Sequence, residues 1–428
     1  MARHQAGSPG AATGLNVAIV GGSIAGCAAA IALRRAGCEV TVYERSRGKL
    51  EDRGAGIGMP LALLHTLIER DFVDAGMAHL QATKAPFVLR ADAEEGAHGQ
   101  GRLLWEHPIA AAVTNWGIMY RHLRSRIPDA IYLQGQEVTA VSDTGGNTVS
   151  VHLAEGHTAQ FDLVVCADGP QSVGRRLLFP AQSLQYVGYI LWRGLAEEQA
   201  VANIPLFEDR LTWAVSATGY CLLYLVPSRT EEVAVGKRQV NWVLYENVAD
   251  TALPGVLTDA HGVVHPTSLP PGVASTAQVA YIHHRARQHF PGYVADAVCA
   301  TPTPFIQAVF DLSIPHYHRG RLCLIGDAST LCRPHAASGA VKALTNAMTL
   351  ADALTTPGAI DDALRAWDAA QSAEGRRLVT LGQVMGRAFV QDVPAWQQMD
   401  AAAMEHWWTA LMREQHWYVT EDARDQQA

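Results

Sequence analysis

The chain contains 428 residues, of which 49% are hydrophobic and 17% are charged, so it can bury a large core and is too long for one minimal domain. Its formal net charge of -8 disfavours a nucleic-acid partner or an anionic membrane surface, because no basic stripe offsets the acidic balance. Seven cysteines occur without a C-x-x-C pair, and this odd count predicts free thiols and a cytoplasmic location.

The N-terminal region predicts a tail followed by a βαβ unit. Residues 1–14 lack the apolar core of a secretory signal, so we expect a flexible tail. The apolar run that follows approaches the length of a membrane span, but glycines interrupt it in the middle. We therefore predict a strand over Leu15–Val20, a turn, and a helix over Ile24–Ala36. A second strand over Cys38–Tyr43 completes the building block of a doubly wound parallel sheet.

The turn between the first strand and the helix has the composition of a phosphate-binding loop. Its glycines let the backbone approach a pyrophosphate, whose charge is favoured at the N-terminus of the following helix. Ser23 stands where a glycine is usual, so a plain tight turn is the alternative. Glu44 ends the second strand 18 residues after Gly26, which suits an acid that binds a ribose hydroxyl. The turn comprises Gly21, Gly22, Ser23, Ile24, Ala25 and Gly26.

Two later strands each end in an aspartate. The first spans Phe161–Cys166 and is followed by Asp168 and a glycine, and the second spans Arg321–Ile325 and is followed by Gly326 and Asp327. Ligands of open α/β sheets bind beyond the carboxyl ends of the strands. Both aspartates are therefore candidate cofactor ligands.

Between these landmarks, strands rich in aromatic residues predict an inserted antiparallel sheet over Tyr186–Leu195, Leu211–Pro227 and Val240–Asn247. Alternation along a strand places Tyr220 and Tyr224 on one face. Residues of this sheet are candidates for an aromatic substrate site, although packing in the sheet core explains each aromatic side chain equally well. The candidates are Trp192, Arg193, Tyr220 and Tyr224.

The C-terminal part of the chain predicts helices after Ala340. Its tryptophans form either a dimer surface or an internal contact with the chain's own core, and we favour the internal contact; a homodimer stays open.

Two adjacent histidines, His283 and His284, point in different directions on a helix, so no metal site is expected. The predicted domains are a cofactor domain over 15–75, 106–180 and 301–390, a substrate domain over 76–105 and 181–300, and a helical tail over 391–428.

Three separated motifs carry a family resemblance. Val42–Arg45, Asp168–Arg175 and the pair formed by Gly326–Ala328 and Arg333–Gly339 resemble the fingerprints of the class A FAD-dependent aromatic hydroxylases. The resemblance covers roughly Asn16 to Val384. It implies an α/β fold with a discontinuous Rossmann-like FAD-binding domain, an inserted antiparallel-sheet substrate domain and C-terminal helices. Within the family, Trp192-Arg193-Gly194 and Arg333–Ala337 are most similar to hydroxylases of hydroxypyridines.

The resemblance also implies roles for individual residues. The glycine turn would approach the FAD pyrophosphate, Glu44 the adenosine ribose with Arg45 beside it, and Asp327 the ribityl or pyrophosphate region. The loop from Pro334 to Gly339 would face the isoalloxazine, with its backbone N–H groups favouring the anionic reduced flavin. The further cofactor-binding candidates are Gly58, Arg121, Asp168, Gly326, Ala337, Ser338 and Gly339.

The implied activity is that of an NADH- or NADPH-dependent monooxygenase. FAD, the nicotinamide and O2 would hydroxylate a small electron-rich ring through a flavin C4a-hydroperoxide. His335 and Pro334 are the catalytic candidates, with His335 acting either in proton transfer or in structuring the loop. Alternatives on the same fold are an epoxidase or Baeyer-Villiger oxygenase, and a flavin-binding protein without turnover. Val341 and Asn346 depart from the usual family pattern and carry no prediction.

Overall fold

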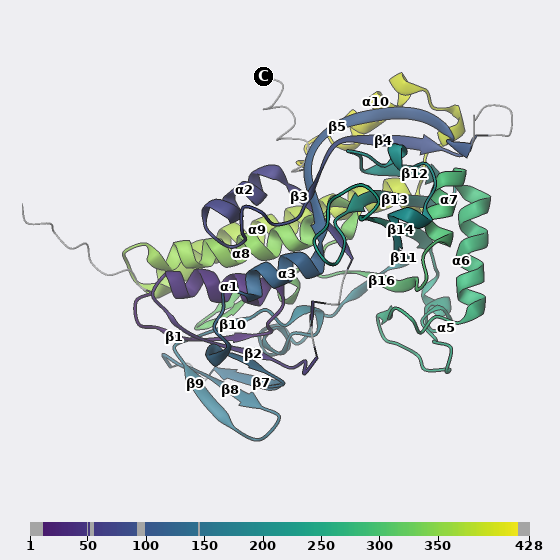
Figure 1. Cartoon of the computed structure of the whole chain (residues 1–428). Helices are drawn as coiled ribbons and strands as arrows, with labels where there is room; N and C mark the ends of the chain where they lie inside the picture. The colour runs from purple at the N-terminus through teal and green to yellow at the C-terminus, as the bar shows by residue number, and fades with distance from the viewer. Residues whose placement is uncertain (1–11, 49, 52–54, 92–98, 144–145, 418–428) are drawn as a thin grey trace, which may run out of the picture.

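The computed structural model describes residues 12–48, 50–51, 55–91, 99–143 and 146–417. The predicted N-terminal tail, apart from residues 12–14, lies outside these ranges. The described chain forms two large β-sheets with helices packed around them (Figure 1). Within the described ranges, no helix combines the length and the apolar character that crossing a membrane requires.

The first sheet is Rossmann-like and has six strands in the order β17-β18-β10-β1-β2-β6. Its central strands pair in parallel, and only the short β17 is antiparallel to its neighbour. The predicted βαβ unit is confirmed, with α1 joining β1 to β2. In order across the sheet, the strands are β17 (His318–Arg319), β18 (Leu322–Leu324), β10 (Leu163–Cys166), β1 (Asn16–Val20), β2 (Glu39–Glu44) and β6 (Tyr132–Gln134).

Helices cover this sheet because its strands are apolar on both faces, as parallel strands usually are. The residues of β10 are all buried, and so are those of β1 after Asn16. Helix α1 (Ile24–Arg35) packs against both α3 (Trp116–Arg124) and the long α8 (Ser338–Thr355). The alanine-rich sequence of α1 permits this close packing, since alanine side chains keep helix axes near each other.

The second sheet has nine strands in the order β15-β16-β11-β14-β13-β12-β4-β5-β3. All neighbouring strands are antiparallel except β12 and β4, which confirms the predicted antiparallel sheet. In order across the sheet, the strands are β15 (Ser268–Leu269), β16 (Phe305–Asp311), β11 (Gln185–Glu197), β14 (Gln239–Asn247), β13 (Gly219–Val226), β12 (Thr212–Ser216), β4 (Leu80–Leu89), β5 (Arg102–Asn115) and β3 (Gly56–Pro60).

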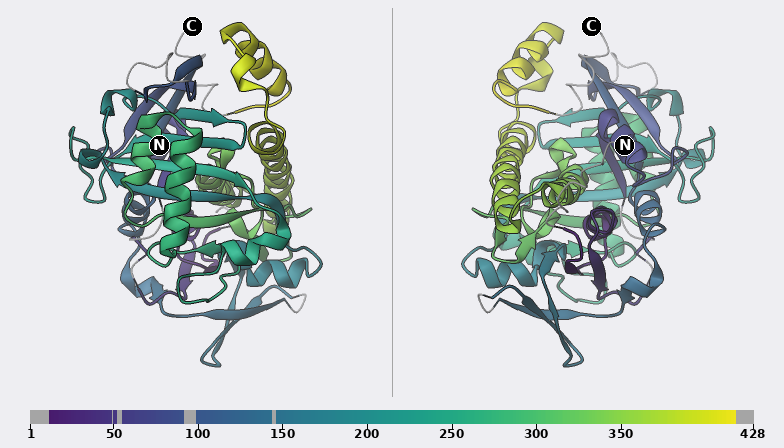
Figure 2. Two further views of the ribbon diagram at one scale, coloured as in Figure 1. Left: turned by 90° about the vertical axis from the view of Figure 1, so that its right-hand side faces the viewer. Right: turned by 90° about the vertical axis from the view of Figure 1, so that its left-hand side faces the viewer.

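Each face of the nine-stranded sheet supports its own hydrophobic core. Helices α6 (Thr276–His289) and α7 (Gly292–Cys299) cover one face, and α9 (Ile360–Gly386) with α10 (Ala401–Leu411) cover the other (Figure 2). Side chains therefore alternate between two packed environments along each strand. The smaller elements are α2 (Leu61–Glu69), α4 (Val173–Leu178), α5 (Leu253–Val256), β7 (Val138–Asp143), β8 (Val149–Leu153) and β9 (Thr158–Phe161).

Three strands from the segments predicted for the cofactor domain belong to the nine-stranded sheet. Strands β3 and β16 and most of β5 fall in predicted cofactor segments, yet they pair in the nine-stranded sheet. Local sequence gives the existence of a strand, whereas its partner depends on distant residues.

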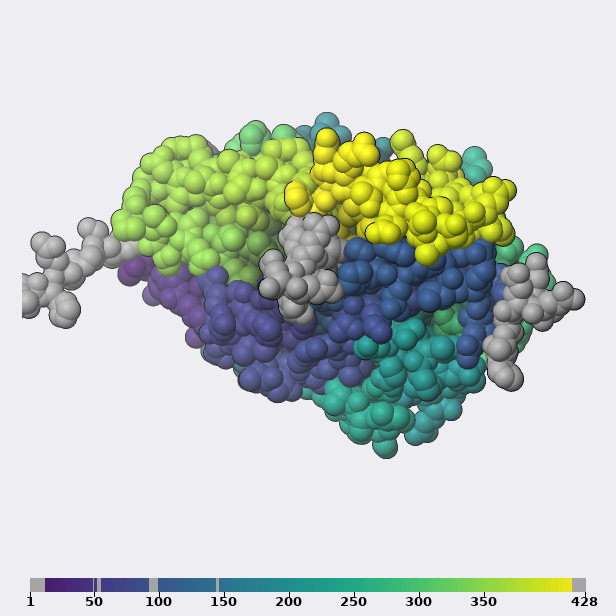
Figure 3. Space-filling view, turned by 90° about the horizontal axis from the view of Figure 1, so that it is seen from above, coloured from purple at the N-terminus to yellow at the C-terminus, as the bar shows by residue number. Residues whose placement is uncertain are grey.

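The C-terminal tryptophans dock on the chain itself, as favoured from the sequence. Trp396, Trp408 and Trp417 are almost completely buried in the core on the α9 side of the sheet. Figure 3 shows the yellow C-terminal segment lying against the blue surface that contains β4 and β5. This packing leaves no need for a dimer partner to cover these three indoles.

Candidate active site

Three loops meet at one edge of the six-stranded sheet. They follow β1, β10 and β18, which are adjacent and parallel, so their carboxyl ends share that edge. The loops carry the glycine turn, Asp168 and Asp327, respectively. Segments separated by roughly 150 residues in the chain are thus brought together, as ligand binding in open α/β sheets requires.

The glycine turn is a conformation that only glycines allow at two of its positions. Gly21 has a φ of +97°, and a Cβ there would lie 2.6 Å from the carbonyl oxygen of Ala167. A Cβ on Gly26 would lie 1.8 Å from the carbonyl oxygen of Gly21. Ser23 begins α1 as its N-cap, but its side chain makes no capping hydrogen bond. The hydroxyl is therefore available beside the helix N-terminus.

Glu44 is fixed beside this turn by backbone donors. Its carboxylate accepts the N–H of Gly22 at 2.8 Å and the N–H of Ser46 at 2.8 Å, and its side chain is buried. Tyr132 donates its hydroxyl to the carbonyl of Gly22 from the other side. Arg45, next to Glu44, is exposed.

Asp168 presents a buried carboxylate oxygen that has no hydrogen-bond partner within the described chain. The other oxygen accepts the N–H of Val173 at 2.7 Å, and burial raises the pKa of this carboxyl group. Arg175 ties this loop to the next one, because its guanidinium donates to the carbonyls of both Pro170 and Ala328. The unpartnered oxygen indicates a ligand group that the protein itself does not supply.

Asp327 is the most exposed of the three acids, with 43% of its side-chain surface accessible. Its Oδ1 accepts a hydrogen bond from the ammonium of Lys342 at 3.2 Å, and that buried ammonium also donates to the carbonyl of Thr330. The preceding Gly326 donates its N–H to Asn346 Oδ1 at 3.0 Å. Asn346, for which no role was predicted, therefore holds the loop that carries Asp327.

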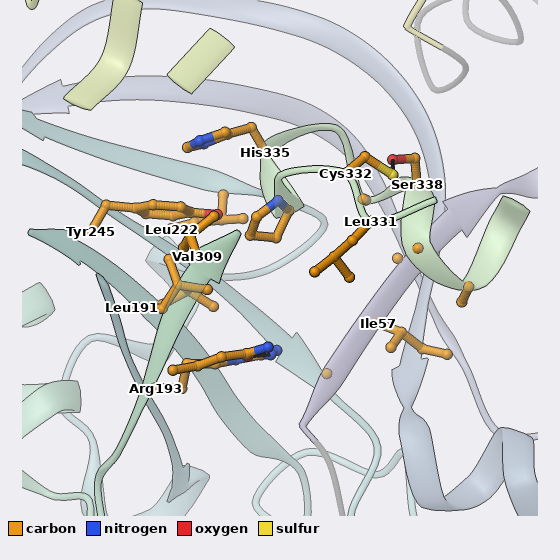
Figure 4. A pocket seen from close by; sticks show the side chains of 18 of the residues that line it. Ile57, Leu191, Arg193, Leu222, Tyr245, Val309, Leu331, Cys332, His335 and Ser338 are labelled. Atoms are coloured by element: carbon orange, nitrogen blue, oxygen red, sulfur yellow. Dashed lines mark hydrogen bonds between the residues drawn. The ribbon is translucent and has the colours of Figure 1, made fainter. Parts of the chain in front are cut away.

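A cavity of about 260 Å³ lies between the loop that follows β18 and the nine-stranded sheet. One side is formed by Gly56–Gly58, Asp327 and the segment from Leu331 to Ala340. Apolar side chains of the sheet form the other side, and Figure 4 shows Leu191, Val309 and Tyr245 facing Ile57 and Leu331 across it. A concave, mostly apolar space with few polar groups suits a small ring.

Arg193 is the cation of this apolar wall. Figure 4 shows its side chain extending from β11 into the cavity. Its Nη1 donates to Gln307 Oε1 at 3.2 Å, while its buried Nε has no hydrogen-bond partner, and no acidic side chain in the described ranges pairs with it. A guanidinium without a counter-ion in such a place favours an anionic ligand.

The other substrate candidates have different positions. Tyr224 lines the cavity, and it shares a face with Tyr220 as predicted. Tyr220 lies deeper, fully buried and stacked on Tyr245 with ring centroids 4.3 Å apart. Trp192 does not line this cavity: its neighbour Arg193 points into it, so alternation sends Trp192 to the α6 side, where its Nε1 donates to Glu246.

His335 is held between two tyrosines. Its Nε2 lies 2.7 Å from the hydroxyl of Tyr189, and its Nδ1 lies 2.6 Å from the hydroxyl of Tyr220. Burial, and then the charge of Arg333, lower the pKa of His335 to about 3. The imidazole is therefore neutral at physiological pH with both nitrogens engaged, which favours the loop-structuring role. Pro334 lines the cavity next to it.

The remaining cofactor candidates fall on both sides of the cavity. Gly58 lies opposite Ala337, which adopts the left-handed conformation with a φ of 54°, and Ser338 and Gly339 begin α8 at the cavity wall. Arg121 instead donates to Glu231 and to the carbonyl of Arg229, so the structure gives it protein partners.

Sequence reasoning missed several lining residues. Trp213, Gln307 and Trp417 were not among the candidates, although each contributes to the cavity wall. Trp213 lies in a segment that was predicted only as a strand, and no element was predicted around Gln307. Nothing local distinguishes a cavity residue from a core residue at either position. The tryptophan content of the C-terminal region was the one available signal for Trp417.

Comparison with known proteins agrees with this geometry. A family of NAD(P)-binding Rossmann-like domains matches residues 19–48, and a family described as FAD binding domain-like matches residues 186–311. The 2,6-dihydroxypyridine 3-monooxygenase of Paenarthrobacter nicotinovorans is 31% identical over 362 residues, which cover 84% of this chain and 87% of that protein. The chain belongs to the FAD-dependent monooxygenases.

Two further relatives support this membership. The structure of 2,6-dihydroxypyridine-3-hydroxylase from Arthrobacter nicotinovorans superimposes with a TM-score of 0.80 at 29% identity, covering 91% of this chain and 97% of that one. The 6-hydroxynicotinate 3-monooxygenase of Pseudomonas fluorescens is 26% identical, covering 80% of this chain and 83% of its own length. The expected family, fold, FAD cofactor and monooxygenase activity are confirmed.

The residues present fit FAD. The glycine turn at a helix N-terminus can approach a pyrophosphate, and Glu44 is fixed where a ribose would follow. The unpartnered Asp168 oxygen and the partly exposed Asp327 provide acceptors for ligand hydroxyl groups. Gly58 and Ala337 both line the cavity, where a Cβ on Gly58 would lie 3.9 Å from the Ala337 Cβ.

Replacing Asp327 with alanine is expected to leave the purified monooxygenase with little bound FAD while the fold is kept. The side chain is partly exposed and Lys342 keeps its bond to the carbonyl of Thr330, so we expect the fold to be retained, but with a lower melting temperature because the buried ammonium loses its acidic partner. Flavin absorbance per protein and the melting temperature measure the two effects. Asp362→Ala, at an exposed site on α9, is the control, and unchanged flavin content in Asp327→Ala would contradict the assignment.

The low pKa of His335 predicts a pH dependence of stability. Unfolding returns the imidazole to its ordinary pKa of 6.5, so below that pH the unfolded chain binds a proton that the folded chain does not. This group therefore lowers the free energy of unfolding progressively from about pH 6.5 toward pH 3. The variant His335→Gln, which cannot titrate, should show a shallower loss of melting temperature between these pH values. Parallel pH curves for the two proteins would refute the buried neutral state.

Proposed function

We propose that this monooxygenase hydroxylates a small hydroxylated heteroaromatic ring of the hydroxypyridine class, which it binds as an anion. The observation that carries the proposal is the Arg193 guanidinium, which enters an apolar cavity and has no acidic partner among the residues that the structure describes. A ring oxygen that has lost its proton supplies the missing negative charge. The names of the relatives that act on dihydroxypyridine and hydroxynicotinate support the same ring class.

Arg193 would serve both binding and chemistry. Its charge favours the deprotonated form of a ring hydroxyl, and the anion is more electron-rich at the neighbouring ring carbons. Apolar side chains such as Leu191 and Val309 exclude water around it, which strengthens the electrostatic attraction. The hydroxyl of Tyr224 is an additional polar group on the same wall.

The loop side of the cavity would hold the cofactor. Bound FAD, reduced by NADH or NADPH, supplies the activation of O2 for transfer to the ring. The first residues of α8 present their backbone N–H groups to the cavity, and the helix dipole favours negative charge there. His335 keeps this loop against the sheet through its two tyrosines, so we assign it to positioning rather than to proton transfer.

The other residue assignments belong to the same proposal. Gly21–Gly26 with Glu44 and Arg45 bind the adenosine and pyrophosphate part of FAD, and Asp168, Gly326, Asp327 and the Ala337–Gly339 segment bind the rest. The two sheets, with exchanges at β3, β5 and β16, define the cofactor and substrate domains.

All seven cysteines are free, which supports a reducing, cytoplasmic location. FAD contact by Arg121 and a homodimer stay predictions.

Anaerobic stopped-flow reduction of the purified flavoprotein tests the proposed function. NADH and NADPH are mixed with the protein alone and with a panel of hydroxypyridines and phenols. We expect one hydroxypyridine to accelerate flavin reduction and to yield a hydroxylated product in air. No acceleration by any ring, with FAD bound, would overturn the substrate class, and an epoxide or inserted oxygen in the product would indicate the alternative oxygenases.

Substitution of Arg193 tests whether the ring binds as an anion. We expect Arg193→Gln to weaken binding of the ionised ring at least about thirtyfold, corresponding to about 2 kcal/mol, because the ligand charge loses its partner in an apolar site. Ring Kd values are measured across pH by flavin absorbance. Arg210→Gln, on the same sheet but outside the cavity, is the control. Equal weakening of neutral and ionised rings would show that Arg193 acts through shape alone.

A further inference from the structure

The C-terminal segment, defined as residues 395–417, closes the cavity that the proposed function uses. We propose that Trp417, the last residue described, is a specificity-determining residue that limits the substrate to a single ring and holds the loop opposite. The inference rests on the proposed function, because it takes this cavity as the substrate pocket. Three observations carry it: the position of the indole, its hydrogen bond to the loop, and its supports.

Trp417 is part of the wall although it is remote in sequence from every other lining residue. It lines the cavity together with Leu211 and Trp213, and only 3% of its surface is exposed. The indole is therefore enclosed by protein on nearly all sides. Its size therefore defines how far the cavity extends in this direction.

The indole also bonds the loop that faces the cavity. Its Nε1 donates to the carbonyl oxygen of Ala336 at 3.2 Å. The next residue, Ala337, has a φ of 54°, a left-handed conformation that is unfavourable for residues other than glycine. A donor on the carbonyl just before this position fixes the peptide orientation that the turn needs.

A second set of contacts holds Trp417 itself. Its ring meets Trp213 edge to face, with centroids 6.1 Å apart, and lies 5.7 Å from Trp408 of α10. Arg377 of α9 donates to the carbonyl of His416 at 2.7 Å. These supports come from three separate elements, so the segment is placed by the fold rather than by its own propensity.

Through Trp213, the indole joins the network that holds His335. Trp213 stacks on Tyr220 with centroids 5.0 Å apart, and Tyr220 bonds His335 Nδ1. The loop from Pro334 to Ala337 is consequently fixed at two points, by the imidazole and by the Ala336 carbonyl. Both points depend on aromatic side chains of the same core. Loss of the Trp417 indole therefore removes the hydrogen bond to the Ala336 carbonyl and also leaves a gap in the cavity wall.

The test compares ring sizes in matched variants. Both Trp417→Leu and Trp417→Phe remove the Nε1 donor. Leucine also leaves a large gap in the wall, whereas phenylalanine leaves a smaller one. Trp396→Leu and Trp396→Phe are the controls, because Trp396 is equally buried in the same segment but does not line the cavity. Hydroxypyridine and hydroxyquinoline are the probes, since the second adds one fused ring.

We expect Trp417→Leu to raise the ratio of kcat/KM for hydroxyquinoline over hydroxypyridine by about tenfold or more, within the range that pocket volume controls. Trp417→Phe should raise it less, and both should release more hydrogen peroxide per nicotinamide oxidised. The Trp396 variants should leave the ratio unchanged. If Trp417→Leu fails to retain FAD or a cooperative melting transition, Trp417→Phe decides the outcome.

An unchanged ratio in a folded, FAD-containing Trp417 variant would overturn this inference, and so would an equal change in the Trp396 variants. The preference for the larger ring is also measured as the ratio of the Kd values of the two rings, which flavin spectra give without turnover. Failure of the wild-type protein to respond to any ring would instead refute the proposed function. The two results are therefore distinguishable in one series of proteins.

Discussion

The cofactor side of the site depends on one geometric constraint, which is that three adjacent parallel strands end at a common edge. Because β10 pairs with β1 on one side and β18 on the other, the loops after them must meet, whatever lies between them in the chain. Arg175 strengthens this meeting by donating to carbonyls of two of the loops. The glycine turn, Asp168 and Asp327 thus share one edge of the sheet, and the loop that carries Asp327 continues into the cavity, whose other wall is the second sheet.

The second sheet supplies chemistry through simple alternation. Adjacent residues of β11 point to opposite cores, so Arg193 reaches the cavity while Trp192 supports α6 on the other face. The charged group is tolerated because its stem packs among apolar neighbours and its guanidinium contacts Gln307 and the ring of Phe305. Nearby, the tyrosines on the α9 side combine hydrophobic packing with hydroxyl groups that hold His335.

Local patterns predicted much of this arrangement. The βαβ unit, the two aspartates after strands and the aromatic strands follow from periodicity and turn chemistry, and all are present. Alternation also placed Tyr220 and Tyr224 on one face. Alternation does not show which face of the sheet meets the cavity, so it cannot separate Trp192 from Arg193 as a substrate residue. The pairing of β3 and β16, the state of His335 and the approach of Trp417 all depend on contacts between distant segments, which no local pattern contains.

The tight approach at Gly386 has a consequence for how this site can vary. A Cβ at that position of α9 would lie 2.5 Å from the Tyr189 hydroxyl, 2.8 Å from Arg333 Nη1 and 3.0 Å from His335 Nε2. The ends of these three polar side chains therefore pack directly against the helix backbone at Gly386. Alanine, which usually favours helices, would fit at this position only if the Tyr189 hydroxyl, the Arg333 guanidinium and the His335 ring moved away from the helix, so a change of this glycine is coupled to the positions of all three groups.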